Sequence, residues 1–340
     1  MNKQLRVVSA LLVSVFLAAC GGGSSSSNSA PNPSGLTASM NTSNYSTISS
    51  ESYSSGLILD SFVTIATAAG VQVSTIRPGL NLKSLTRQLL SESMLAGSLP
   101  ATVVGVVTNR TVACGVSGNY TVTFNDADNS TTFTAGDIVT SVYSGCVTSS
   151  AAGNFTRNGT AVTSLTRVVG DFTNQNSYFE LSGNLNFQNL AINLAATTST
   201  PAVSLNLLGN IASASVNNPT GTSTDATTIS ALSVSSGADS LVYSNYQLDE
   251  TTDNVAKVFT KNGQGIFTDS SFGSVALATS VPFQGAIGGN PSAGRLRIEG
   301  ANAFAYVTAI DAFSARLELD LAKDGTIDAS QAVAWSAITF

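Results

Sequence analysis

The 340-residue chain contains no histidine. This absence excludes a Ser-His-Asp or Cys-His catalytic arrangement, a histidine-ligated metal and an imidazole proton switch. Charged residues make up 10% of the chain, against about a quarter in a typical soluble protein. No stretch is rich in lysine or arginine, so we expect no nucleic-acid partner. Ser, Thr, Asn and Gly are abundant instead, which is typical of β-rich proteins outside the cytoplasm.

The first apolar run is too short to be a transmembrane helix. It extends from Val7 to Ala18 without a charge, whereas a membrane-spanning helix needs about 20 residues. Lys3 and Arg6 precede it, and a basic start followed by a short apolar run is typical of a signal peptide. We therefore predict that residues 1–19 are a signal peptide.

The end of this run decides where the protein is expected to reside. Leu17-Ala18-Ala19-Cys20 resembles the lipobox of bacterial lipoproteins, which implies that Cys20 is lipidated and becomes the first residue of the mature chain. Two or more acyl chains anchor a protein stably, whereas one chain binds only marginally. Gly21 follows, and not the Asp that retains lipoproteins in the inner membrane of enteric bacteria. We expect an outer-membrane protein that faces the periplasm or the cell surface.

Cysteine is scarce, with three residues in the chain. With Cys20 lipidated, Cys114 and Cys146 can pair only with each other, and an oxidising compartment favours this disulfide over two buried free thiols. A hairpin over residues 115–145 with its turn near residues 128–131 would oppose residues whose numbers sum to about 260. The disulfide would then join facing positions at the open end of that hairpin.

Two segments separate the anchor from the body of the protein. Gly, Ser, Asn and Pro dominate residues 20–50, which predicts a flexible tether; up to about Asn44 its ends lie on the order of 25 to 30 Å apart. Helical periodicity follows in residues 51–100, with a first helix that begins at Ser49 or Ser50 and ends at Gly70. A second amphipathic helix is expected over 82–96, with the apolar stripe Leu82, Leu85, Leu89 and Met94.

Residues 101–340 have the period of two that indicates strands with one buried face. Apolar residues alternate with polar ones in Tyr120–Val122–Phe124, Leu185–Phe187, Leu205–Leu207 and Leu317–Leu319–Leu321. Pairs that tolerate positive φ are expected to form the turns, namely Gly153-Asn154, Asn158-Gly159, Gly183-Asn184, Gly209-Asn210 and Asn262-Gly263. We predict a mainly β fold, in which one large antiparallel meander sheet, curled or partly closed, carries the amphipathic helices.

Several segments resemble a family of uncharacterised proteobacterial outer-membrane lipoproteins. The resemblance covers most of the mature chain and lies in Asp126-Ala127-Asp128, Gly136-Asp137-Ile138, Asn158-Gly159-Thr160, 294–301, Asp324-Gly325 and Trp335. It implies a location and a β-rich architecture. It implies no activity, because the family has none established.

Acidic residues offer the nearest approach to a metal or catalytic site. Asp320, Asp324 and Asp328 are spaced like part of a calcium loop, but Ala322 and Gln331 occupy ligand positions, so a plain Asp-Gly turn is favoured. A second acidic group, with the same two interpretations, is Asp126, Asp128 and Asp137. The run Asp249, Glu250 and Asp253, followed by Lys257 and Lys261, is interpreted as a loop.

These observations favour a protein without a cofactor and without catalytic activity. We expect a structural or interaction lipoprotein that contacts the membrane through its acyl chains and has an envelope protein or lipid as partner. The alternative is a carrier that binds an apolar ligand in a cavity between sheet and helices. A third hypothesis is a hydrolase that uses paired carboxylates.

Overall fold

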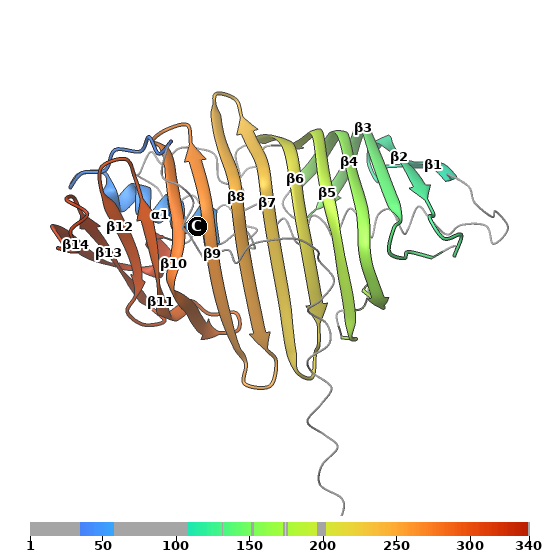
Figure 1. Cartoon of the computed structure of the whole chain (residues 1–340). Helices are drawn as coiled ribbons and strands as arrows, with labels where there is room; N and C mark the ends of the chain where they lie inside the picture. Colours follow the sequence, from blue (N-terminus) through green and yellow to red (C-terminus); the bar gives the residue numbers. More distant parts are fainter. Residues whose placement is uncertain are drawn as a thin grey trace, which may run out of the picture.

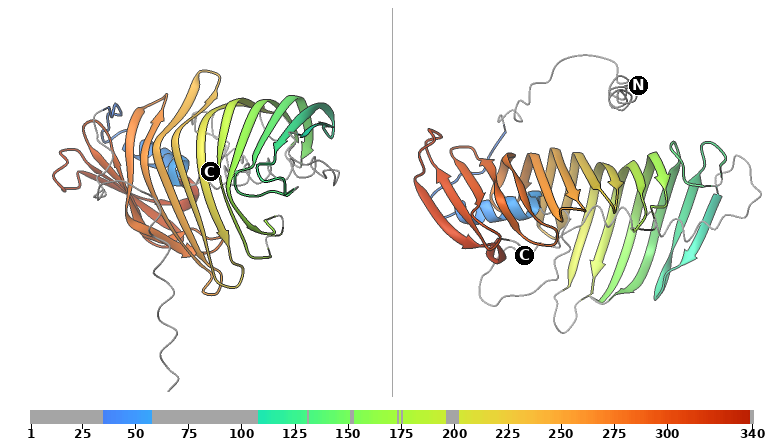
Figure 2. Two further views of the ribbon diagram at one scale, coloured as in Figure 1. Left: turned by 45° about the vertical axis from the view of Figure 1, so that its right-hand side comes forward. Right: turned by 90° about the horizontal axis from the view of Figure 1, so that it is seen from below.

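The computed structural model describes residues 35–57 and 108–338, apart from 131, 151–152, 173, 175 and 196–201. It confirms the predicted fold class. Fourteen strands form one antiparallel sheet in which every strand pairs with its neighbours in chain order. The sheet is open, and its C-terminal strands curl around a helix (Figure 1, Figure 2).

The strands are long in the middle of the sheet and short at its C-terminal edge. Their bounds are β1 Thr108–Ala113, β2 Ser117–Asn125, β3 Ile138–Ser150, β4 Gly153–Gly170, β5 Phe179–Leu194, β6 Val203–Asn217, β7 Thr222–Ser236, β8 Asp239–Asp253, β9 Val258–Asp269, β10 Gly273–Ala286, β11 Pro291–Glu299, β12 Phe304–Ala309, β13 Ser314–Asp320 and β14 Ala329–Ala334. The helix α1 spans Tyr45–Leu57, and a short 3₁₀ helix, η1, spans Trp335–Ala337.

One face of the sheet carries the core, as the alternation in the sequence predicts. We call this the inner face, and it is the face toward α1. Its buried side chains form one cluster that includes Tyr120, Tyr143, Leu185, Phe187, Leu207, Ile229, Tyr243, Phe267, Phe283, Val307 and Leu317. The last residue of the predicted alternation, Leu321, lies beyond β13 and is exposed, so that part of the prediction is wrong.

The helix α1 begins earlier than predicted. The backbone N–H groups of Asn44 and Tyr45 donate to the carbonyl of Asn41, so this turn starts the helix before Ser49. The helix lies over β9–β13, where the ring of Tyr53 contacts those of Phe283 and Trp335 with both centroid distances at 5.2 Å. The predicted continuation to Gly70 and the helix over 82–96 lie outside the described residues.

The N-terminal stretch is fixed to the sheet before the helix starts. The N–H groups of Thr37 and Ala38 donate to the carbonyl of Ser274 at 3.2 and 3.1 Å. Asn302 brackets Met40, accepting from its N–H and donating to its carbonyl, both at 2.8 Å. The flexible tether predicted for 20–50 therefore does not extend past residue 36, because packing fixes the chain from there.

Four of the five predicted turn dipeptides lie inside strands, whereas Gly153-Asn154 begins β4 and borders the β3–β4 turn, close to its predicted place. Gly159 lies at the register shift between β4 and β5, and Gly209 borders the shift between β5 and β6, with φ of 107° and 135°. A Cβ at either position would collide with a backbone carbonyl of the next strand. The residues tolerate positive φ as predicted, but they use it in β-bulges, which bend and twist the long strands. The local bends in β4 and β6 thus involve glycines that the sequence pattern alone assigns to turns.

Candidate functional site

The predicted lipidation site, Cys20, lies outside the described residues, but its reach is fixed by geometry. Sixteen residues lie between it and Thr37, the first described residue that is hydrogen-bonded to the sheet. Fully extended, they span about 60 Å. Thr37 and Met40 attach where the β9–β10 and β11–β12 turns lie, and we call this end of the strands the tether end. Within the described residues, no helix is long and apolar enough to cross a membrane.

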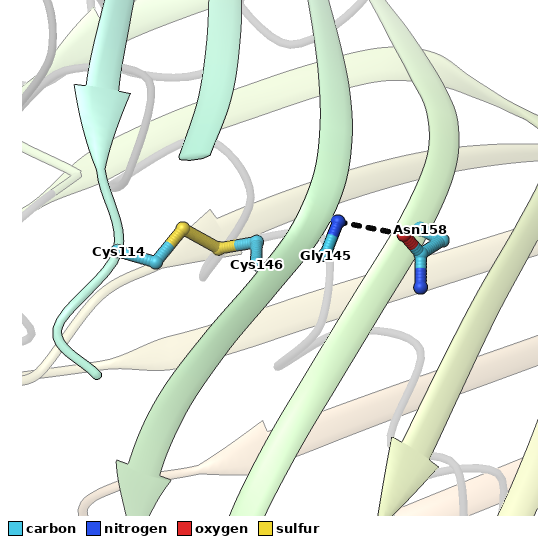
Figure 3. The surroundings of a disulfide bond; sticks show 4 residues. All are labelled: Cys114, Gly145, Cys146 and Asn158. Atoms are coloured by element: carbon cyan, nitrogen blue, oxygen red, sulfur yellow. Dashed lines mark hydrogen bonds between the residues drawn. A yellow bond between two sulfur atoms is a disulfide. The ribbon is translucent and has the colours of Figure 1, made fainter. Parts of the chain in front are cut away.

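The predicted disulfide joins Cys114 and Cys146, whose Cα atoms are 5.4 Å apart (Figure 3). The predicted register is wrong, because Tyr120 pairs with Tyr143, three residues away from the position that the sum of 260 requires. The cause is the connection between β2 and β3, which spans residues 126–137 and is not a tight turn. Cys114 lies in the turn between β1 and β2, so the disulfide fixes that turn to β3.

Two glycines with positive φ lie beside the disulfide, and one of them lets neighbouring strands approach closely. Gly118 has φ of 74°, and a Cβ there would collide with the carbonyl of Gly145. Gly145 has φ of 56°, and its N–H donates to Oδ1 of Asn158 at 2.6 Å (Figure 3). The side chain of Asn158 thereby satisfies a backbone group that the bulge removes from the ladder. This arrangement is structural, and it holds the bulged strand next to the sulfur atoms.

The acidic group Asp126, Asp128 and Asp137 is brought together at the opposite end of β2 and β3. One carboxylate oxygen from each lies within 4.8 Å of the others. Asp137 is buried and accepts from the N–H groups of Ala127 and Thr134 at 2.9 and 2.6 Å. Hydrogen bonds, first from the side chain of Ser130, lower the pKa of Asp128. These carboxylates therefore act as acceptors that order their own loop.

The weak calcium candidate forms the β13–β14 turn, and its three carboxylates hold that turn. Asp320 accepts from the N–H groups of Asp324 and Gly325 at 3.2 and 2.9 Å. Asp328 accepts from the N–H of Leu321 at 2.7 Å, and Asp324 accepts from Thr326, which lowers the pKa of Asp324. In the part of the chain that the structure describes, these three residues do not form a cluster of metal-ligating atoms.

Comparison with family models, curated proteins and solved structures finds no match. The possible roles of the acidic groups, the disulfide and the charged residues therefore rest on their geometry alone.

Sequence reasoning missed a charged row that crosses three strands on the inner face. Asp225 of β7 pairs with Glu250 of β8, and Glu250 pairs with Lys261 of β9. The ammonium of Lys261 lies 3.1 Å from Oε2 of Glu250, and both side chains are largely buried. The interpretation of residues 249–253 as a loop is wrong, because they continue β8. The signal was the alternation itself: two steps of two from the buried Tyr246 lead through Leu248 to Glu250.

Proposed function

We propose that the protein is a non-catalytic, lipid-anchored module of the outer membrane, with its sheet as a structural or interaction platform. The observation that carries the proposal is the use of the turn carboxylates. Those of Asp137, Asp253, Asp311, Asp320, Asp324 and Asp328 each accept from a backbone N–H of the turn or loop that they border. Carboxylates engaged in this way stabilise turns, and this use supports a structural role for them over a hydrolytic one.

The anchor rests on Leu17-Ala18-Ala19-Cys20. Fixation of the chain from Thr37 onward supports a body that is held near the membrane by a connection of limited length. The tether end would then face the bilayer at rest, and the opposite turns would point away from it.

The test compares wild type with Cys20→Ala in cells labelled with palmitate. We expect label in wild type and its recovery with the outer membrane, and for the variant an unlabelled, unprocessed precursor absent from the outer-membrane fraction. Cys114→Ala is the matched control and should keep the label. Equal labelling and outer-membrane recovery of Cys20→Ala would refute the anchor.

The second candidate function is a carrier of an apolar ligand. The observation in its favour is the inner face, on which buried apolar side chains continue from β2 to β13. Detergent-free protein that carried a lipid would show the added mass in native mass spectrometry. For the structural module we expect the mass of the chain alone.

A further inference from the structure

The inner face of the middle strands is covered, although the outer face of the same strands is not. On β6, Leu207 is 0% exposed and its neighbour Leu208 is 51% exposed. On β3, Tyr143 is 3% exposed and Val142 is 43% exposed. Adjacent residues of one strand have the same flanking strands, so strand neighbours cannot account for the difference. A layer of other residues must exclude water from the inner face.

The described helix does not supply this layer over the middle strands. The helix α1 lies over β9–β13 and reaches β8 at its C-terminal end, where the hydroxyl groups of Tyr243 and Tyr246 donate to the carbonyls of Ser55 and Gly56. Toward β1, the loop residue Phe133 packs on Phe124. With Phe172 it also covers Leu165, Phe179 and Leu181, which lie near one end of β4 and β5. Among the described helices and strands, none outside the sheet lies over the inner face of β4–β7.

The ends of one segment of the chain lie on either side of this face. Residues 58–107 start where α1 ends, next to β8, and finish where β1 begins at Thr108. Seven strand spacings of about 4.8 Å separate these two points, or roughly 34 Å along the sheet. Fifty residues are ample for this distance even in helical form, at about 1.5 Å per residue.

The composition of this segment suits packing against an apolar face. About half of residues 58–107 are apolar, and its charged residues are Asp60, Arg77, Lys83, Arg87 and Glu92. The stripe of Leu82, Leu85, Leu89 and Met94 recurs at helical spacing, as expected for a segment that packs on an apolar surface.

We propose that residues 58–107 dock on the inner face of β4–β7 and complete the core that α1 begins over β9–β13. The occupant of the apolar face is then a part of the same chain. A lipid could bind there only by displacing it, so this inference weighs against the carrier function and goes beyond the structural one.

The experiment places a benzophenone amino acid at Thr227 or, in a separate variant, at Thr228. Both residues are threonines of β7; Thr227 is half-buried on the inner face, in the same alternation as Ile229, and Thr228 is exposed on the outer face. The host is the full chain from residue 20 with Cys20→Ala, so the outcome does not depend on the anchor. After illumination, peptide mapping by mass spectrometry identifies what each position contacts.

We expect the probe at position 227 to crosslink to peptides from 58–107 and the probe at position 228 to give at least tenfold less of that product. A crosslink from 227 to a lipid or to a second copy of the chain would overturn the proposal, as would the absence of any product within 58–107. Circular dichroism and a non-reducing gel confirm that both variants keep the sheet and the disulfide. Failure of the anchor would show separately, in the palmitate labelling.

Discussion

The two ends of the sheet are stabilised by different means. At the C-terminal end, short strands curl around α1, and the rings of Tyr53, Phe283 and Trp335 meet in the enclosed space. At the N-terminal end, α1 is far along the sheet, and a covalent bond ties the β1–β2 turn to β3. Both ends share the same alternating pattern. The difference teaches that alternation forms the sheet, whereas the element that faces it decides how each end is held.

Loss of the indole of Trp335 should have the largest effect on this comparison. The ring is fully buried, and its Nε1 donates to the carbonyl of Asp311 at 2.9 Å. We expect Trp335→Ala to lower the free energy of unfolding by about 3–5 kcal/mol, because it leaves a cavity. Urea unfolding followed by circular dichroism measures this. Phe313→Ala is the control; its side chain is 82% exposed, so a change below about 0.5 kcal/mol is expected. If the two variants unfolded at the same urea concentration, the buried ring of Trp335 would not contribute to stability as proposed.

Removal of the disulfide should weaken the other end. The bond closes a loop with a sequence separation of 32 residues, for which we expect a loss of about 3–4 kcal/mol in the double variant Cys114→Ala, Cys146→Ala. Hydrogen exchange should show lost protection in β1–β3 before β11–β13. Uniform loss across the sheet would show that the two ends are not held independently.

A substitution at Gly118 tests how the N-terminal end of the sheet, which carries the disulfide, is stabilised. Its positive φ and the nearby carbonyl of Gly145 predict that Gly118→Ala lowers the free energy of unfolding by roughly 1–3 kcal/mol. Gly115→Ala is the matched control, since a Cβ at Gly115 meets no atom within 4 Å. If both variants unfold at the same urea concentration, the close approach of the strands has no energetic weight.

The smallest expected effect concerns the buried tyrosines at the contact between α1 and the sheet. Burial raises the pKa of Tyr246 and of Tyr53 above the ordinary value. Because the pKa of these tyrosines is higher in the folded state than in the unfolded state, they do not reduce stability below about pH 10. Above that pH the tyrosines of the unfolded chain ionise more readily, so the free energy of unfolding falls as pH rises. Tyr246→Phe should cost about 1 kcal/mol at neutral pH through the lost hydrogen bond to Gly56. Its unfolding midpoint should then decline less than that of wild type between pH 9 and pH 11, and an equal decline would count against this assignment.

The strands of the sheet could be predicted from the sequence, but the positions of its turns and β-bulges could not. Alternation at Tyr120, Val122 and Phe124 identifies buried strand faces whatever their partners, and the two cysteines left after Cys20 had one way to pair. Asn158-Gly159 was assigned to a turn because turns and bulges both need residues that tolerate positive φ. The local sequence does not say which of the two the neighbouring strand imposes.

The remaining misses have the same physical cause, contacts between distant residues. The buried side of α1 includes Ser49 and Ser52, so an apolar stripe could not mark where that helix begins. The row of Asp225, Glu250 and Lys261 becomes visible only when the register of β7, β8 and β9 is known. The sequence therefore predicts features that depend on periodicity along one strand, and it does not predict features that depend on which strands pair and in which register.

The contacts of Thr37, Met40 and α1 also impose an order on assembly. In the described sheet, strands pair only with chain neighbours, so each hairpin can form as soon as its own residues are present. Met40, however, bonds to Asn302, 262 positions later. The N-terminal part of the body therefore cannot reach its final place before most of the sheet, up to the β11–β12 turn, is present.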